Sequence, residues 1–129
     1  MYYPCNYGFV PHTLSADGDP ADVLVLSEER LIPGCVISVR PLGVLIMEDE
    51  AGRDEKILAV PTAKISPLYN KVLSIDDLPQ IKLDQISHFF THYKDLEKNK
   101  WVKVIGWEGV EAALKILQEA MEQGKAGKK

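Results

Sequence analysis

The apolar residues of the chain follow different periods in its two halves. In the first sixty residues they form short β-branched runs at 22–26, 35–47 and 56–60, separated by turn residues. Such runs are typical of strands. Pro41 and Gly43 interrupt the longest run, which predicts a sharp bend or bulge, as at the corner of a barrel. The opening segment 3–11 and the segment 49–55 are interpreted as loops or turns. The first half is therefore predicted to be β-rich and barrel-like.

After an irregular connector, the spacing changes to that of a helix. Leu83, Ile86, Phe89, Phe90 and Tyr93 recur three and four positions apart, which predicts a helix with one apolar face. A further strand is predicted at 101–107 and a second helix at 108–125. Acidic residues near the start of the second helix, and Gly and Lys near its end, agree with the helix dipole and C-cap preferences. Strands followed by helix, strand and helix predict an α+β fold.

Length and composition narrow the class of protein. The chain has 129 residues, 46% apolar and 26% charged, which predicts a single domain over 1–129. A net charge of −4 without a basic stripe argues against a nucleic-acid partner. Two cysteines are too few for a disulfide framework. No apolar run approaches the ~20 residues of a membrane span, so we expect a cytoplasmic protein without a membrane partner.

The segment 15–26, SADGDPADVLVL, carries three carboxylates within six positions. Asp, Gly and Pro also build ordinary turns, so Asp17, Asp19 and Asp22 alone leave a turn and a metal site equally open. Asp49 and Asp54 form a second acidic group beside another predicted strand. Five carboxylates at one end of a barrel repel one another unless cations lie between them. Their hard oxygen atoms suit Mg²⁺ or Mn²⁺ rather than zinc.

An EF-hand loop fits the same segment poorly. With Asp17 at position one, Asp19 and Glu28 occupy metal-binding positions of such a loop. However, Asp22 stands where the sharp turn requires Gly, and a strand is predicted where a helix should follow.

Lysine and tyrosine side chains accompany the aspartates. Lys56 and Lys94 are expected at a strand end and on a helix, and Tyr7 and Tyr93 as half-buried aromatic residues. Taken singly, each is better explained by solvation or packing. Together, ammonium groups and phenolic donors around a Mg²⁺ cluster form a site for phosphate oxygens.

The ordered motifs YPCNYG, DGDPADVLV, DEAGRDEK and HFFTHYKDLEKNKWVKVIGW resemble those of the family I soluble inorganic pyrophosphatases, in particular the bacterial ones. The resemblance covers nearly the whole chain. It implies a small, mainly antiparallel, OB-like β-barrel flanked by two helices. It also implies Mg²⁺-dependent hydrolysis of pyrophosphate to two phosphates, and the hard oxygen donors allow Mn²⁺ as a substitute. Since Met1 stands almost directly before YYPCNYG, the family's N-terminal segment, with barrel strands and further ligands, is expected to be missing and activity to be impaired.

The resemblance implies a role for each polar residue of these motifs. Asp19 would orient and deprotonate the attacking water. Asp22 would lie between two activating metal ions, and Asp49 with Asp54 would hold a further, substrate-borne Mg²⁺. The implied metal ligands are Asp17, Asp22, Asp49 and Asp54. The residues implied to contact the phosphates or the nucleophile are Tyr7, Lys56, Tyr93 and Lys94.

Two histidines lie one turn apart on the first predicted helix. The spacing of His88 and His92 can bind a transition metal, but no third ligand is apparent, so two partly exposed histidines are the favoured interpretation. Bacterial members of the family are typically hexamers with this helix at a subunit contact. We therefore expect a homo-oligomer that loosens when these histidines are protonated.

Two classes of function follow from the sequence. The first is a Mg²⁺-dependent inorganic pyrophosphatase. The alternative is a non-catalytic divalent-metal-binding or interaction module that retains the acidic segment. A broader nucleotide hydrolase is the least favoured class, because the chain has no P-loop motif.

Overall fold

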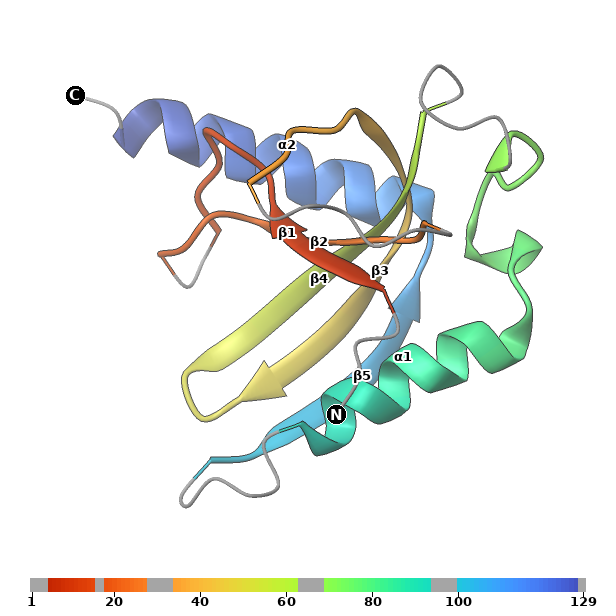
Figure 1. The fold of residues 1–129 in the computed structure, drawn as a ribbon. Helices are drawn as coiled ribbons and strands as arrows, with labels where there is room; N and C mark the ends of the chain where they lie inside the picture. Colours follow the sequence, from red (N-terminus) through yellow and green to blue (C-terminus); the bar gives the residue numbers. More distant parts are fainter. Residues whose placement is uncertain (1–4, 16–17, 28–33, 63–68, 94–99, 128–129) are drawn as a thin grey trace.

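The computed structural model describes residues 5–15, 18–27, 34–62, 69–93 and 100–127. These residues form a five-stranded sheet and two α-helices (Figure 1). The strands are β1 (Asn6–Phe9), β2 (Asp22–Val25), β3 (Val39–Asp49), β4 (Gly52–Pro61) and β5 (Val102–Glu108). The helices are α1 (Gln80–His92), α2 (Val110–Gly127) and the short 3-10 helix η2 (Ile75–Asp77).

The sheet has the strand order β1-β2-β4-β3-β5. Three of the four neighbouring pairs are antiparallel, and only β2 and β4 run parallel. Strands β3 and β4 form a hairpin in which Asp49 pairs with Gly52 across a two-residue turn. Gly52 has a φ of 125°, a conformation that favours glycine, and the Ala51 amide donates a hydrogen bond of 2.9 Å to Asp49 Oδ1.

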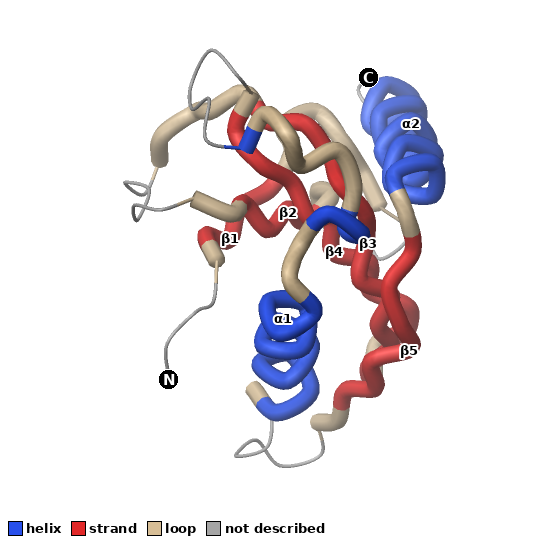
Figure 2. The backbone as a smooth tube through the Cα atoms, turned by 90° about the vertical axis from the view of Figure 1, so that its right-hand side faces the viewer, coloured by secondary structure: helices blue, strands red, loops and turns tan. Residues whose placement is uncertain are grey.

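The two α-helices cover opposite faces of the sheet, as Figure 2 shows. Because strand side chains alternate between faces, Leu24 packs on the α1 side with Ile86 and Phe90. The neighbouring Val23 packs on the α2 side in the cluster that contains Ala113. Each helix therefore buries its apolar stripe against one face, and both faces of the central strands are buried.

The predicted fold class is confirmed: the fold is α+β, with a mainly antiparallel sheet and two flanking helices. The closed barrel expected from the sequence is not seen within the described residues, where the sheet is open with β1 and β5 at its edges. The bulge predicted at Pro41 and Gly43 is confirmed by a register shift between them. A Cβ on Gly43 would lie 2.6 Å from the Glu108 carbonyl oxygen, so only glycine fits there.

Two loop predictions were wrong. Residues 6–9 form β1 because they pair with β2, a contact that the local sequence does not reveal. In the segment 49–55, only the turn is a loop, since β4 begins at Gly52. The predicted run 35–47 forms a strand only from Val39, and it extends to Asp49. None of the helices in the described residues is long and apolar enough to cross a membrane.

Candidate active site

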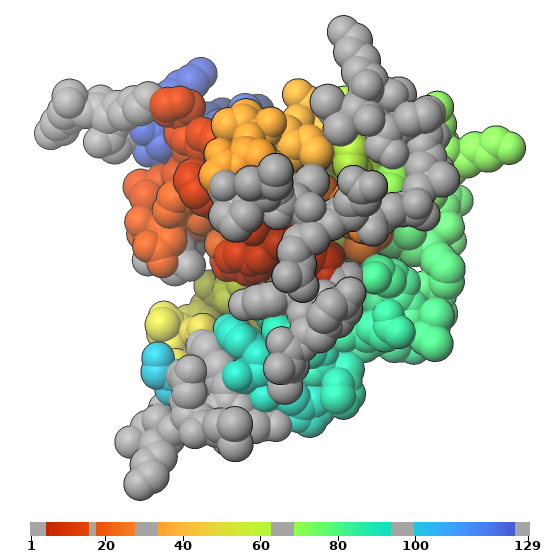
Figure 3. Space-filling model, viewed as in Figure 1, coloured from red at the N-terminus to blue at the C-terminus, as the bar shows by residue number. Residues whose placement is uncertain are grey.

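A cavity of about 310 Å³ lies between β1, β2, the β3–β4 hairpin and the end of α1. In Figure 3, the red surface of β1, the yellow surface of the hairpin and the teal surface of α1 lie near one another on one face. All seven predicted site residues that the structure describes line this cavity. They are Tyr7, Asp19, Asp22, Asp49, Asp54, Lys56 and Tyr93. The other two, Asp17 and Lys94, lie outside the described residues.

The cavity continues the face of the sheet that α1 covers. Read backwards along β4, the buried residues Val60 and Leu58 on this face are followed at alternate positions by Lys56 and then Asp54. Along β3, the buried Met47 is likewise followed by Asp49 on the same face. The apolar core and the charged site therefore lie on the same face of the sheet, next to each other along β3 and β4.

The parallel pairing of β2 with β4 brings two distant motifs together. Asp22 is the register partner of Lys56, although 34 residues separate them. The loop before β2 is closed by Thr13, whose hydroxyl donates to the Val10 carbonyl at 2.6 Å and accepts from the Ala21 amide at 2.9 Å. This closed loop fixes the start of β2 and with it the carboxylate of Asp22.

Lys56 is the most closely surrounded charge in the site. Its Nζ atom lies 3.2 Å from Asp22 Oδ2 and 3.2 Å from Asp54 Oδ2, and its side chain is only 4% exposed. Nζ also donates to the Tyr7 hydroxyl at 3.5 Å. The rings of Tyr7 and Phe90 lie 5.1 Å and 5.3 Å from it, within reach of cation–π attraction. A buried ammonium is stable here because it is paired on several sides.

The same neighbours shift the pKa values of the site. Burial raises the pKa of Asp54 and the charges of Asp22 and Asp49 raise it further, against the opposing effect of Lys56. Burial also raises the pKa of the Tyr7 phenol well above its usual range. Burial lowers the pKa of Lys56, but the charge of Asp54 and its other neighbours outweigh this and raise it overall. At neutral pH, Lys56 is therefore a cation and Tyr7 a neutral hydroxyl donor.

The donor atoms in the cavity suit a hard divalent cation. The carboxylates offer only oxygen ligands, which Mg²⁺ prefers. A positive charge already lies between two of them, the ammonium of Lys56. Among the described residues, which do not include Asp17, no group of three or more His, Cys, Asp or Glu side chains is arranged to hold a metal ion. The oxygen donors thus fit Mg²⁺ chemically, and two of them are engaged by Lys56.

Sequence reasoning missed two contributors to this region. Arg53 also lines the cavity, where its Nε lies 3.6 Å from Glu55 in an ion pair whose arginine side chain is 60% exposed. Such exposed pairs contribute roughly 0–1 kcal/mol to stability. Phe90 was predicted only as a core residue, yet its ring also faces the Lys56 ammonium. Only the folded register could reveal that contact, because 34 positions separate the two residues in sequence.

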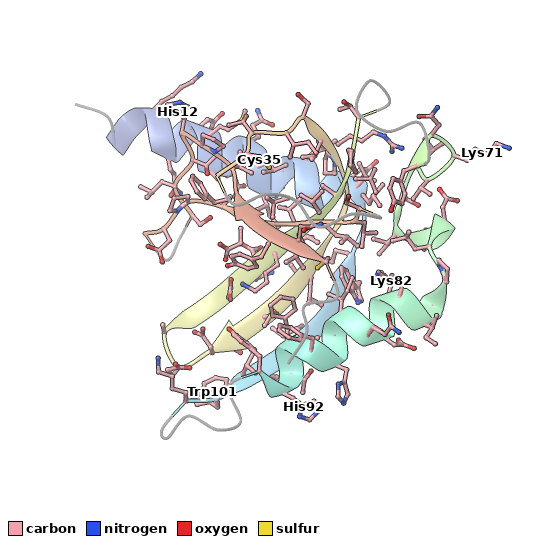
Figure 4. All side chains as sticks on the ribbon, in the orientation of Figure 1. His12, Cys35, Lys71, Lys82, His92 and Trp101 are labelled. Carbon is pink, nitrogen blue, oxygen red and sulfur yellow. The ribbon has the colours of Figure 1, made fainter. Side chains whose placement is uncertain are left out.

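His88 and His92 lie on α1 with ring centroids 4.4 Å apart. Both side chains are exposed, and His92 points outward from the helix in Figure 4. Within the described part of the chain, no third ligand joins them in a metal-binding group. The favoured interpretation of two exposed histidines agrees with this geometry.

Comparison with known proteins identifies the family. The family described as Inorganic pyrophosphatase matches residues 1–125. The chain belongs to the inorganic pyrophosphatase family. It is 62% identical to an inorganic pyrophosphatase of Bradyrhizobium diazoefficiens. The alignment spans 128 residues, which are 99% of this chain and 72% of that protein. An inorganic pyrophosphatase of Agrobacterium fabrum is 62% identical over 125 residues, or 97% of this chain and 71% of that protein.

Solved structures of inorganic pyrophosphatases share the fold. The inorganic pyrophosphatase of Helicobacter pylori superposes with a TM-score of 0.95 at 54% identity, covering 97% of this chain and 74% of that one. That of Thermus thermophilus superposes with a TM-score of 0.93 at 44% identity, covering 97% of this chain and 72% of that one. The resemblance inferred from the sequence motifs is thus confirmed.

Proposed function

We propose that the 310 Å³ cavity is the site at which this enzyme hydrolyses inorganic pyrophosphate to two phosphates, with Mg²⁺ as its cofactor. The observation that carries the proposal is the convergence of acidic, ammonium and phenolic groups in one cavity of an inorganic pyrophosphatase chain. Pyrophosphate is strongly anionic, so the carboxylates would repel it without cations. The non-catalytic module is not favoured, because the chain belongs to a family named for this hydrolysis.

In the proposed reaction, Asp22, Asp49 and Asp54, with Asp17, would hold Mg²⁺, which would supply charge that acidifies the attacking water and offsets the substrate anion. The water oxygen forms a bond to one phosphorus, and the bond from that phosphorus to the bridging oxygen breaks. Asp19 accepts the proton from the water. The departing phosphate keeps the electron pair of the broken bond.

The protein's own cations and hydroxyls position the substrate. Lys56 donates to phosphate oxygens as a point charge, and Lys94 is proposed to act in the same way. Tyr7 and Tyr93 donate hydrogen bonds through their hydroxyls, and the raised pKa of Tyr7 keeps its hydroxyl neutral for this role. These groups stabilise charge as it develops and form no covalent bond to the substrate.

The test is phosphate release from magnesium pyrophosphate by the wild-type chain and by Asp19→Asn. Loss of a positioned base lowers the rate by roughly 10²–10⁴-fold, while Mg²⁺ binding measured by calorimetry should change little. Asp76→Asn is the matched control, because Asp76 is an exposed aspartate on η2 outside the cavity. Hydrolysis by Asp19→Asn at the wild-type rate would show that Asp19 is not the base.

We further propose that the enzyme works in the cytoplasm as a homo-oligomer, a hexamer by family resemblance, with α1 at a subunit contact. The exposed pair His88 and His92 supports a pH-sensitive contact on this helix, because two neighbouring imidazolium ions repel each other. Light scattering between pH 5 and 8 tests this proposal. A molar mass that stays constant between pH 5 and 8 would contradict the pH-sensitive contact. The mass of a monomer at every pH would contradict the oligomer itself.

A further inference from the structure

The ammonium of Lys56 has two roles that compete in this structure. As a substrate ligand it must reach a phosphate oxygen, yet its Nζ lies 3.2 Å from a carboxylate oxygen of each of Asp22 and Asp54. These two aspartates are also the proposed metal ligands. The ammonium and a divalent cation therefore compete for the same carboxylate oxygen atoms.

We propose that Lys56 is an internal counter-ion of the metal site, which Mg²⁺ displaces from Asp22 and Asp54, and that this displacement releases the ammonium to bind phosphate. The inference rests on the proposed function and adds a mechanism for coupling between its two ligands. One ammonium cannot contact both the two carboxylates and a phosphate oxygen at short range. A metal ion that takes its place at the carboxylates therefore frees it for phosphate, so metal binding and phosphate binding favour each other through Lys56.

The surroundings of Lys56 explain why the ammonium is present before any metal. Asp22 and Asp54 lie close together in a partly buried cavity, with side chains 23% and 15% exposed. Two carboxylates in such a position repel each other unless a positive charge compensates them. Lys56 supplies that charge, because its Nζ lies 3.2 Å from an oxygen atom of each carboxylate.

The same surroundings contain groups that can stabilise the ammonium after it leaves the carboxylates. The Tyr7 hydroxyl lies 3.5 Å from Nζ, and the rings of Tyr7 and Phe90 lie 5.1 Å and 5.3 Å away. Aromatic faces attract a cation but carry no formal negative charge. They can therefore stabilise the displaced ammonium without using a carboxylate that the metal ion would need. The backbone of Lys56 is paired with β2 on one side and β3 on the other, so the movement is confined to its flexible four-carbon side chain.

Calorimetry on the full chain tests the coupling without any turnover. Mg²⁺ is titrated into wild type, Lys56→Met and Lys71→Met, each with and without inorganic phosphate. Lys71 is the matched control for net charge, because it is an exposed lysine that points away from the sheet in Figure 4. Without phosphate, Lys56→Met should bind Mg²⁺ about tenfold more tightly than wild type, and phosphate should then enhance Mg²⁺ binding about tenfold less. Lys71→Met should match wild type in both respects.

Equal or weaker Mg²⁺ binding by Lys56→Met, or an unchanged effect of phosphate, would overturn the inference. Should Lys56→Met fail to fold, the wild-type chain provides an independent measurement. Its Lys56 ammonium is followed by nitrogen-15 NMR, and the resonance should move when Mg²⁺ is added and move again when phosphate follows. A resonance that stays in place at saturating Mg²⁺ would refute displacement.

The two proposals can fail separately. A chain that shows this exchange but releases no phosphate from pyrophosphate would refute the proposed function alone. A chain that hydrolyses pyrophosphate while its Lys56 resonance ignores Mg²⁺ would refute this inference alone.

Discussion

Replacing Phe90 by Leu separates the packing of the core from the support of the active site. Phe90 is 1% exposed, and its ring lies 5.3 Å from Lys56 Nζ, 5.0 Å from the Phe89 ring and 5.5 Å from the Tyr93 ring. Phe89→Leu is the matched control, because Phe89 is also in the core and also contacts two aromatic rings, at 5.0 Å and 6.1 Å. The ring contact with Lys56 belongs to Phe90 and is lost only in the first variant.

The expected magnitudes follow from these contacts. Each aromatic pair contributes about 0.5–1.5 kcal/mol beyond its buried area, so both variants lose about 1–3 kcal/mol from two such pairs. The cation–π contact of a desolvated ammonium adds about 1–2 kcal/mol to the loss for Phe90→Leu alone. Phe90→Leu should therefore unfold with a free energy about 1–2 kcal/mol lower than Phe89→Leu.

Urea denaturation measures this difference, and phosphate binding measures its functional effect. Both rings contact Tyr93, but only Phe90 also contacts Lys56, so Phe90→Leu should bind magnesium phosphate several-fold more weakly than Phe89→Leu. Equal stability and equal phosphate affinity in the two variants would refute the role assigned to the Phe90 ring.

Two further predictions concern alkaline pH and the packing of α2. The folded-state pKa of Tyr7 lies above its unfolded value of about 10, so its stabilising contribution is complete below pH ~10 and is lost as the pH rises further. Urea denaturation between pH 8 and 11 should show a shallower alkaline loss of stability for Tyr7→Phe than for wild type, and parallel profiles would contradict this. A Cβ on Gly124 would lie 2.2 Å from the His12 carbonyl oxygen, so Gly124→Ala should destabilise the chain by about 1–3 kcal/mol, as overpacking does. Gly109→Ala is its control, since a Cβ there meets no atom within 4 Å, and equal melting temperatures of the two variants would contradict the clash.

The elements that the sequence predicted well are those whose signal is local. The spacing of Leu83, Ile86 and Phe90 identified α1, because a helix places such positions on one face. The irregularity at Pro41 and Gly43 was likewise visible, since both residues disfavour a regular strand. Strand β1 was missed because its half-exposed residues form a strand only through pairing with β2.

The candidate site was predicted as a set of residues but not as an arrangement. The motifs named the aspartates and Lys56, and their residue types already indicated a metal and phosphate site. The pairing of Lys56 with Asp22 depends on the parallel register of β2 and β4, which no local pattern encodes. The contact between Phe90 and Lys56 depends on how α1 lies on the sheet, which residue spacing does not specify either.

The parallel pair β2–β4 also predicts an order for the events of folding. The β3–β4 hairpin closes over a two-residue turn, whereas Asp22 and Lys56, which pair in β2 and β4, are separated by 34 positions in sequence. Contacts of long sequence separation form more slowly than local ones, because loop closure must come first. A chain that has formed only the hairpin holds Asp49, Asp54 and Lys56 without Asp22. Binding of Mg²⁺ through Asp22 and Asp54 together would therefore report completion of the fold, and the ion would stabilise the native state over every intermediate that lacks this strand pair.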